Sequence, residues 1–285
     1  MKLLLLFAAA GWALAQAQAQ AQAPDIDQIM TRVALNQAKS QDSRQEWVFN
    51  QKQLLRMIRA NGKPAREERR EYLIIPKRRH IQKQLTKFEG KYTDRGKEVA
   101  YDHPNYQYKG LDIDGQLLDE MSNDMTDDKK SADGIARDLF PLTYHEQLKY
   151  NFRLKGGEDY RGRQVYRVAF EPKPHEHADD EDSFLWKGEA LIDAAESQPV
   201  LVNTSMATKI PMAVRILLGT NIRGLGFSVS YQKFADGVWF PVSYGGEFDV
   251  RAVFFYRRKI SVSMANSDFR RTDVSSNIAY AIEDK

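Results

Sequence analysis

The last third of the chain, residues 183–271, is a succession of runs rich in β-branched and aromatic residues, and little of it has helical spacing. Such runs favour strands, and turn sequences between them are typical of a meandering antiparallel sheet. We expect Asp236-Gly237 and Gly245-Gly246 to be two of the turns. The runs are 184–186, 190–192, 200–202, 227–234, 238–248 and 250–256. The sequence therefore predicts a mostly β fold dominated by a large sheet.

The N-terminus has the pattern of a secretory signal peptide. Lys2 supplies a positive charge, residues 3–14 form an apolar run, and Ala13-Leu14-Ala15 fits the small-x-small cleavage rule. The run is shorter than a bilayer-spanning helix, which needs about 20 residues. We expect cleavage near Ala15 and export to the periplasm, with 16–23 as a low-complexity tether. The alternative is an uncleaved membrane anchor.

Composition narrows the class of protein. The chain has 285 residues and no cysteine, so its exported form must be stable without disulfides. Its length allows it to bury enough apolar surface for that. We expect a single domain over 24–275, followed by a tail at 276–285. The net charge of +3 does not suggest a nucleic-acid partner.

A charged run occupies residues 66–71 on an expected strand. Its simplest interpretation is a solvated strand face, and the alternative is a weak attraction to anionic lipid headgroups. The run interleaves arginines with glutamates, and two further arginines follow it: Arg66, Glu67, Glu68, Arg69, Arg70 and Glu71, then Arg78 and Arg79.

An amphipathic helix and a three-stranded meander are expected before residue 90. The helix covers 24–39, because its apolar residues recur every three or four positions. Strands are expected at 46–60, 66–75 and 79–88; Asn61-Gly62 forms the first hairpin turn and Pro76 ends the second strand. The helix presents Ile26, Ile29, Met30 and Val33 on one face, and the first strand presents Trp47, Phe49, Leu55 and Met57.

Residues 101–145 are polar and rich in Asp, and we interpret them as a helical insertion lying against the sheet. One helix is expected at 114–125 and a second at 132–139. The apolar positions of the first helix are Leu117, Leu118, Met121 and Met125.

Strands resume after the insertion. Residues 150–154 and 164–171 alternate between apolar and polar side chains, and Gly156-Gly157 is expected to form the turn between them. Residues 209–225 are markedly apolar and interrupt the later sheet. They predict a short helix or an ordered loop over a sheet edge or a cavity mouth.

No catalytic motif is present, and a large exported sheet without such chemistry points to binding rather than catalysis. The best metal candidate is His175-Glu176-His177, because two imidazoles at i and i+2 of an extended chain point the same way. The segment lies in an acidic loop, and a solvated loop is its simpler interpretation. We therefore expect no metal, no cofactor and no enzymatic activity.

The order of elements, together with three short sequence motifs, resembles that of the periplasmic lipoprotein-localisation carriers, the LolA/LolB-like proteins, and of related outer-membrane lipoprotein-sorting proteins. The motifs are residues 160–166, 186–193 and 231–242, the last containing Asp236-Gly237-Val238-Trp239-Phe240-Pro241. The chain departs from the carriers in its length, its larger insertion and its acidic loop.

The resemblance implies a strongly curved antiparallel sheet, a half-barrel, whose concave face is covered by helices and receives acyl chains. It implies a soluble carrier of lipid or of the acylated end of a lipoprotein, with an inner- or outer-membrane envelope protein as a further partner. An envelope-stress sensing or protein-interaction module on the same scaffold is the alternative. The cavity candidates are Trp47, Phe49, Leu55, Met57, Phe184, Trp186 and Ile192. The lid candidates are Met121, Met125, Met212, Ile216 and Leu217.

Overall fold

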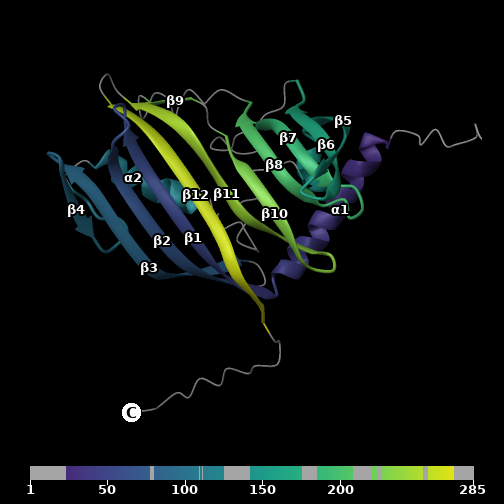
Figure 1. Ribbon diagram of the computed structural model, residues 1–285, viewed down its shortest axis with the longest axis horizontal. Coiled ribbons are helices and arrows are strands. Elements are labelled where there is room, and N and C mark those ends of the chain that lie inside the picture. Colours follow the sequence, from purple (N-terminus) through teal and green to yellow (C-terminus); the bar gives the residue numbers. More distant parts are fainter. Residues whose placement is uncertain are drawn as a thin grey trace, which may run out of the picture.

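A curved, open antiparallel sheet forms most of the structure and confirms the expected half-barrel with helices on its concave face (Figure 1). The computed structural model describes residues 24–77, 80–108, 110, 112–124, 142–174, 185–207, 220–223, 226–252 and 256–272. The expected signal peptide, tether, tail and second insertion helix (132–139) lie outside these residues.

Eleven strands of the described chain follow one another across the sheet, and a twelfth, β9 (Thr220–Arg223), pairs with β11. From one edge to the other the order is β4 (Lys97–Tyr101), β3 (His80–Asp94), β2 (Pro64–Lys77), β1 (Trp47–Arg59), β12 (Tyr256–Arg271), β11 (Val238–Ala252), β10 (Ser228–Ala235), β8 (Pro199–Met206), β7 (Trp186–Asp193), β6 (Arg163–Pro172) and β5 (Tyr150–Tyr160).

The first strand of the chain pairs with the last. β1 lies between β2 and β12, and Leu55 stands opposite Glu68 on one side and Val262 on the other. This pairing joins a group formed by β1 to β4 with a group formed by β5 to β12. The two halves of the sheet therefore share a continuous inner face, the concave side that the helices cover.

Two helices of the described chain lie on this inner face, at different places. α1 (Ile26–Arg44) contacts β11 and β5, whereas α2 (Ile113–Asp124) contacts β1 and β2 (Figure 1). Asp25 caps α1 by accepting a hydrogen bond from the backbone N–H of Asp27. A third, single-turn helix, α3 (Tyr144–Gln147), contacts α1 and β5. No helix in the described residues is long and apolar enough to cross a membrane.

Two apolar clusters are buried between these elements. The larger, here called the main core, collects residues of α1, α2 and strands from both halves, including Val33, Leu118 and Ile260. The smaller, here called the aromatic cluster, consists of Phe49, Tyr72, Ile74, Ile81 and Phe240, with Trp47, Val238 and Phe269 packed against it. Trp239 and Phe240 are consecutive on β11 but belong to different clusters.

Some expected turns are confirmed and others are wrong. Asn61-Gly62 and Asp236-Gly237 do separate strands, with Gly62 and Gly237 at positive φ. Gly156-Gly157 does not: β5 continues through a bulge to Tyr160, and the turn is Arg161-Gly162, where both residues have positive φ. Glycine permits a bulge as readily as a turn, so the sequence alone does not distinguish them.

Other expected boundaries also shift. β2 continues through Pro76, which pairs with Ile81 near the end of the hairpin. β4 has no counterpart among the expected strands, and within the expected apolar interruption, residues 220–223 form β9. The rest of that interruption, 208–219 and 224–225, lies outside the described residues.

Gly245-Gly246 was also expected to form a turn, and this expectation is wrong. Both residues lie inside β11, so the runs 238–248 and 250–252 belong to one strand. A Cβ at Gly246 would lie 2.1 Å from the backbone oxygen of Gly226, and one at Gly245 would lie 2.5 Å from that of Val262. The glycines therefore permit a close approach of backbones where the sheet bends.

We predict that Gly246→Ala lowers the free energy of unfolding by about 1–3 kcal/mol, because the added methyl group overpacks this contact. Gly157→Ala is the matched control in a strand, since its Cβ would meet nothing closer than 3.7 Å. Urea unfolding of the two variants measures the difference. Equal stabilities of the two variants would contradict the proposed close approach.

Candidate functional site

The surface of the sheet on which α2 packs carries a cluster of buried, paired charged side chains. Arg66, Glu68 and Arg70 alternate along β2, so all three side chains point to the inner face. They are 2%, 0% and 2% exposed. The expected solvated strand face is therefore wrong for these three residues, whereas Arg69, on the other face, is largely exposed.

Glu68 lies between the two arginines. Its carboxylate accepts hydrogen bonds from Arg66 Nε at 3.0 Å and Arg70 Nε at 2.9 Å. The hydroxyl of Tyr101, at the end of β4, donates to Glu68 Oε1 at 2.5 Å. Asp112 and Asp119 pair with Arg66 and Arg70 respectively from the helix side. These six side chains are here called the ion network.

The electrostatics of the network keep both arginines charged. Burial lowers the pKa of Arg66, but Tyr101, Glu68 and Asp112 outweigh it, so the pKa lies above its ordinary value. Burial likewise opposes the charge of Arg70, and its contacts with Glu68 and Asp119 again raise the pKa. Burial and the carboxylate of Glu68 raise the pKa of the Tyr101 phenol, which therefore stays protonated as a donor.

α2 is attached by apolar side chains that pack on the main core and by polar contacts around them; Ile113, Leu117 and Met121 pack against the core while partly buried. Leu118 is its one fully buried apolar side chain among the described residues and enters the main core. Ser122 donates to Gln53 of β1 at 2.6 Å. Asp114 accepts from the Tyr256 hydroxyl at 2.6 Å and from Arg258 Nε at 3.0 Å, both on β12. The helix therefore spans three strands, with carboxylates facing cations and a phenol.

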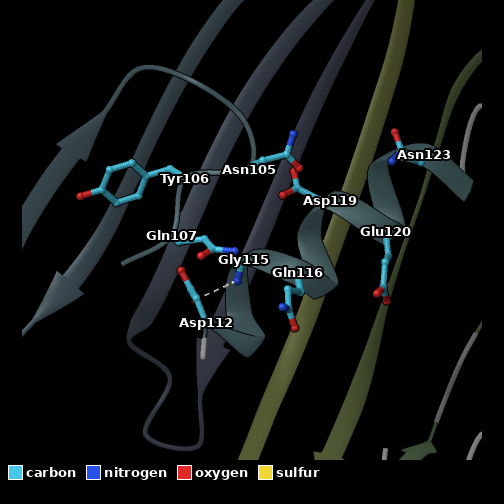
Figure 2. Close-up of a pocket in the computed structure, with 9 residues that line it drawn as sticks. All are labelled: Asn105, Tyr106, Gln107, Asp112, Gly115, Gln116, Asp119, Glu120 and Asn123. Carbon is cyan, nitrogen blue, oxygen red and sulfur yellow. Dashed lines mark hydrogen bonds between the residues drawn. The ribbon is translucent and has the colours of Figure 1, made fainter. Parts of the chain in front are cut away.

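A polar pocket of about 230 Å³ opens between α2 and the loop that precedes it (Figure 2). Asp112 and Asp119 belong both to its wall and to the ion network beneath it. Amide and carboxylate groups dominate the lining, which suits water and polar ligands rather than a hydrocarbon chain. The lining residues are Asn105, Tyr106, Gln107, Asp112, Gly115, Gln116, Asp119, Glu120 and Asn123.

A second hollow, of about 520 Å³, lies over the central strands. Much of its lining comes from exposed residues, such as Lys52, Arg69 and Ser263, that alternate with the inner-face positions. None of the residues predicted to line a cavity lines either of these two hollows.

The predicted cavity residues are buried on the inner side of the fold. Leu55, Met57, Trp186 and Ile192 belong to the main core. Phe49 belongs to the aromatic cluster, and Trp47 packs against that cluster. The side chains of β1 that the sequence grouped together therefore divide between two clusters, because Gln51 and Gln53 stand between them. Their contact with a ligand stays a prediction.

Most of the predicted lid residues cannot be placed. Met121 of α2 packs against the main core. Phe184, Met125, Met212, Ile216 and Leu217 lie outside the described residues, as do His175 and His177. Within the described part of the chain, no three His, Cys, Asp or Glu side chains gather as a metal site would require.

Sequence reasoning missed the ion network and the buried glutamines. A signal was present: Arg66, Glu68 and Arg70 recur with the period of a strand, on the strand that follows the Asn61-Gly62 hairpin. Gln51 and Gln53 likewise occupy the same alternating positions as Phe49 and Leu55. In both cases the period placed a polar side chain on the side that also carries the apolar residues.

Comparisons with known proteins give structural matches and no sequence match. No protein-family model and no curated protein matches the chain. The chain is similar in structure to an outer membrane lipoprotein-sorting protein domain from Vibrio parahaemolyticus, at 12% identity and a TM-score of 0.36, over 86% of this chain and 94% of that one. A LolA superfamily protein from Nitrosomonas europaea matches at 10% identity and a TM-score of 0.35, over 88% and 96%. Similarity at this level says nothing of ligand or activity.

We predict that Glu68→Gln lowers the free energy of unfolding by about 3–5 kcal/mol, because it leaves two buried guanidinium groups without their shared counter-charge. Glu89→Gln is the control, since Glu89 lies on the exposed surface beside Lys87 and its loss should leave the unfolding midpoint unchanged. Chemical denaturation measures both variants. A tolerated Glu68→Gln would contradict the role given to this carboxylate.

We further predict that stability declines at alkaline pH through Tyr101 and Tyr256. Burial, and then the carboxylates of Glu68 and Asp114, raise the pKa of the two phenols above the ordinary value. Unfolded tyrosines ionise near pH 10 while these stay protonated, so their stabilisation is complete below about pH 10 and is lost as the pH rises further.

The double variant Tyr101→Phe/Tyr256→Phe tests this prediction. Its free energy of unfolding should decline less steeply than that of the wild type above about pH 10, by up to about 1.4 kcal/mol per pH unit for each tyrosine. The comparison of the two slopes removes the contribution of other titrating groups. Parallel slopes would show that the phenols do not carry the dependence.

Proposed function

We propose that this chain is an exported, non-catalytic carrier or binding protein for lipid or for the acylated end of a lipoprotein. The observation that carries the proposal is the inner face of the half-barrel. It buries apolar side chains from both halves of the sheet, and the described part of its cover includes α2, a short helix whose apolar contacts are flanked by hydrogen bonds and ion pairs.

Displacement of α2 would expose the apolar surface around Leu55 and Met57 while leaving the sheet intact. Each methylene of an acyl chain buried there gains about 0.8 kcal/mol, so a long chain can compensate for the contacts of one helix. Arg66, Glu68 and Arg70 lie on the same strand and stay paired with one another when the helix leaves. The departure is therefore reversible, with water replacing the aspartates.

The sequence pattern of the N-terminus and the resemblance to lipoprotein-localisation carriers support a periplasmic location and an acylated cargo. A donating or receiving envelope protein would then be a partner, because the chain carries no nucleotide-binding motif to drive transfer. The direction of transfer would follow from differing affinities of the partners.

Lipid extraction and rebinding test the proposal. Native protein purified from the periplasm should release lipid into organic solvent, identified by mass spectrometry, and delipidated protein should bind a fluorescent fatty-acid analogue. Protein that carries no lipid and binds no analogue, yet captures a defined envelope protein, would instead favour the sensing or interaction module.

We predict that Arg258→Met speeds the association of the fatty-acid analogue, because it removes the ion pair of Asp114 with β12 and leaves only the Tyr256 hydroxyl on that carboxylate, without touching the apolar surface. A contact worth about 1 kcal/mol gives roughly a fivefold rise in the open population. Arg257→Met is the matched control, since Arg257 is exposed on the neighbouring position of the same strand. Stopped-flow fluorescence measures both rates; equal rates in the two variants would count against movement of α2.

A further inference from the structure

A line of buried polar groups crosses the inner face between the main core and the aromatic cluster. It is here called the polar seam and consists of Ser122 of α2, Gln53 and Gln51 of β1, Asn266 of β12 and the Pro241 carbonyl of β11. Ser122 donates to Gln53 Oε1 at 2.6 Å, and Gln53 Nε2 donates to Gln51 Oε1 at 3.0 Å. At the far end, Asn266 Nδ2 donates to the Pro241 carbonyl at 2.9 Å.

The seam is interrupted at its centre. Gln51 Nε2, a donor, and Asn266 Oδ1, an acceptor, are buried and have no hydrogen-bond partner among the described residues. Gln51 is 0% exposed and Asn266 is 7% exposed. They face each other as a cross-strand pair of β1 and β12, which places their Cβ atoms about 5 Å apart.

The partners at either end fix which atoms are left over. A carbonyl only accepts, so Asn266 must turn its Nδ2 toward Pro241 and keep Oδ1 for the gap. The Ser122 hydroxyl can donate or accept, but Met264 Sδ is only an acceptor; its contact with Gln53 at 3.7 Å assigns Nε2 to that side of Gln53, so Gln51 turns its Oε1 to Gln53 and keeps its Nε2. The gap thus presents one donor and one acceptor.

This pair defines the chemistry of a ligand. The ligand must accept from Gln51 and donate to Asn266, and it must be neutral, because the seam holds no charge and the neighbouring arginines are already paired with carboxylates. A carboxylate or an ester offers no donor, and an ammonium group offers no acceptor. A trans secondary amide offers both, on opposite sides of its plane.

The surroundings define the rest of the ligand. Along β1 the next inner side chains are Phe49, in the aromatic cluster, and Leu55, in the main core. A group held in the gap therefore has apolar surface on both sides. Ser122, in the last turn of α2, makes the helix part of the cover over the seam, so the gap becomes accessible when α2 moves.

We propose that the inner face binds a long-chain secondary amide, an N-acyl group, whose carbonyl accepts from Gln51 Nε2 and whose N–H donates to Asn266 Oδ1. The inference rests on the proposed function and narrows its cargo: hydrocarbon chains joined through an amide are preferred over the corresponding esters.

A matched pair of neutral ligands tests the inference on the full-length delipidated protein. N-ethyl dodecanamide and ethyl dodecanoate differ only in N–H against O, and displacement of a fluorescent fatty-acid analogue gives the affinity of each. The amide should bind about tenfold tighter, because the ester leaves Asn266 Oδ1 unpaired. Asn266→Leu should remove this preference, and Gln51→Met should weaken both ligands because both carbonyls lose their donor.

The outcomes separate the two proposals. Equal affinities of wild type for the amide and the ester would overturn the inference and leave the carrier function standing; this result is expected if the two side chains bond directly to each other or hold only a water molecule. Failure of both ligands to displace the analogue would overturn both. The wild-type comparison needs no variant, so it decides the matter even where Asn266→Leu fails to fold.

Discussion

The pairing of buried charges beneath α2 determines where that helix sits. β2 brings two guanidinium groups to a buried face, and Glu68 neutralises only one of them. Further negative charge must come from another element, and Asp112, just before α2, and Asp119, on α2, supply one carboxylate to each arginine. Because an unpaired buried charge is very costly, α2 can dock in few other positions. The remaining polar contacts of the helix, to β1 and β12, follow from this placement.

The same arrangement explains why an ionic attachment suits a movable cover. A helix held by apolar packing alone would, on moving, expose apolar surface to water both on itself and on the sheet. Here the aspartates regain water, and Glu68 continues to bridge Arg66 and Arg70 on the strand. The aspartates thereby lower the cost of opening, while Leu118, with Ile113, Leu117 and Met121 beside it, fixes the position of the helix on the main core.

Pattern in the sequence identified most of the elements but not all of their bounds, and it did not identify the site. The period of 3.6 in residues 26–33 and the alternation in β1 gave the helix and the strand, since both are local properties. The strand has nearly the expected ends, whereas α1 continues to Arg44, beyond the expected end at residue 39. The resemblance gave the half-barrel. The glycine pairs were ambiguous, because Gly245-Gly246 serves a contact with Gly226 that is distant along the sheet.

The ion network could not be predicted for a related reason. Charged residues are usually exposed, and only the docking of α2 and the pairing of Arg70 with Asp119, 49 positions along the chain, makes their burial possible. The gap between Gln51 and Asn266 depends on a still longer separation along the chain, because β1 comes early and β12 late in the sequence of the domain although the two strands are paired. Local periodicity identifies which face a residue occupies but not what lies across from it.

The pairing of β1 with β12 also dictates when the chain can fold. Trp47 stands opposite Arg271, so the central ladder of the sheet cannot form until almost the whole domain has been released. Long loop closure of this kind slows folding and keeps the two halves apart as partly structured pieces. If the chain is exported unfolded, as proposed above, late completion is an advantage: the strand that completes the sheet is the last to emerge, and folding before export is disfavoured.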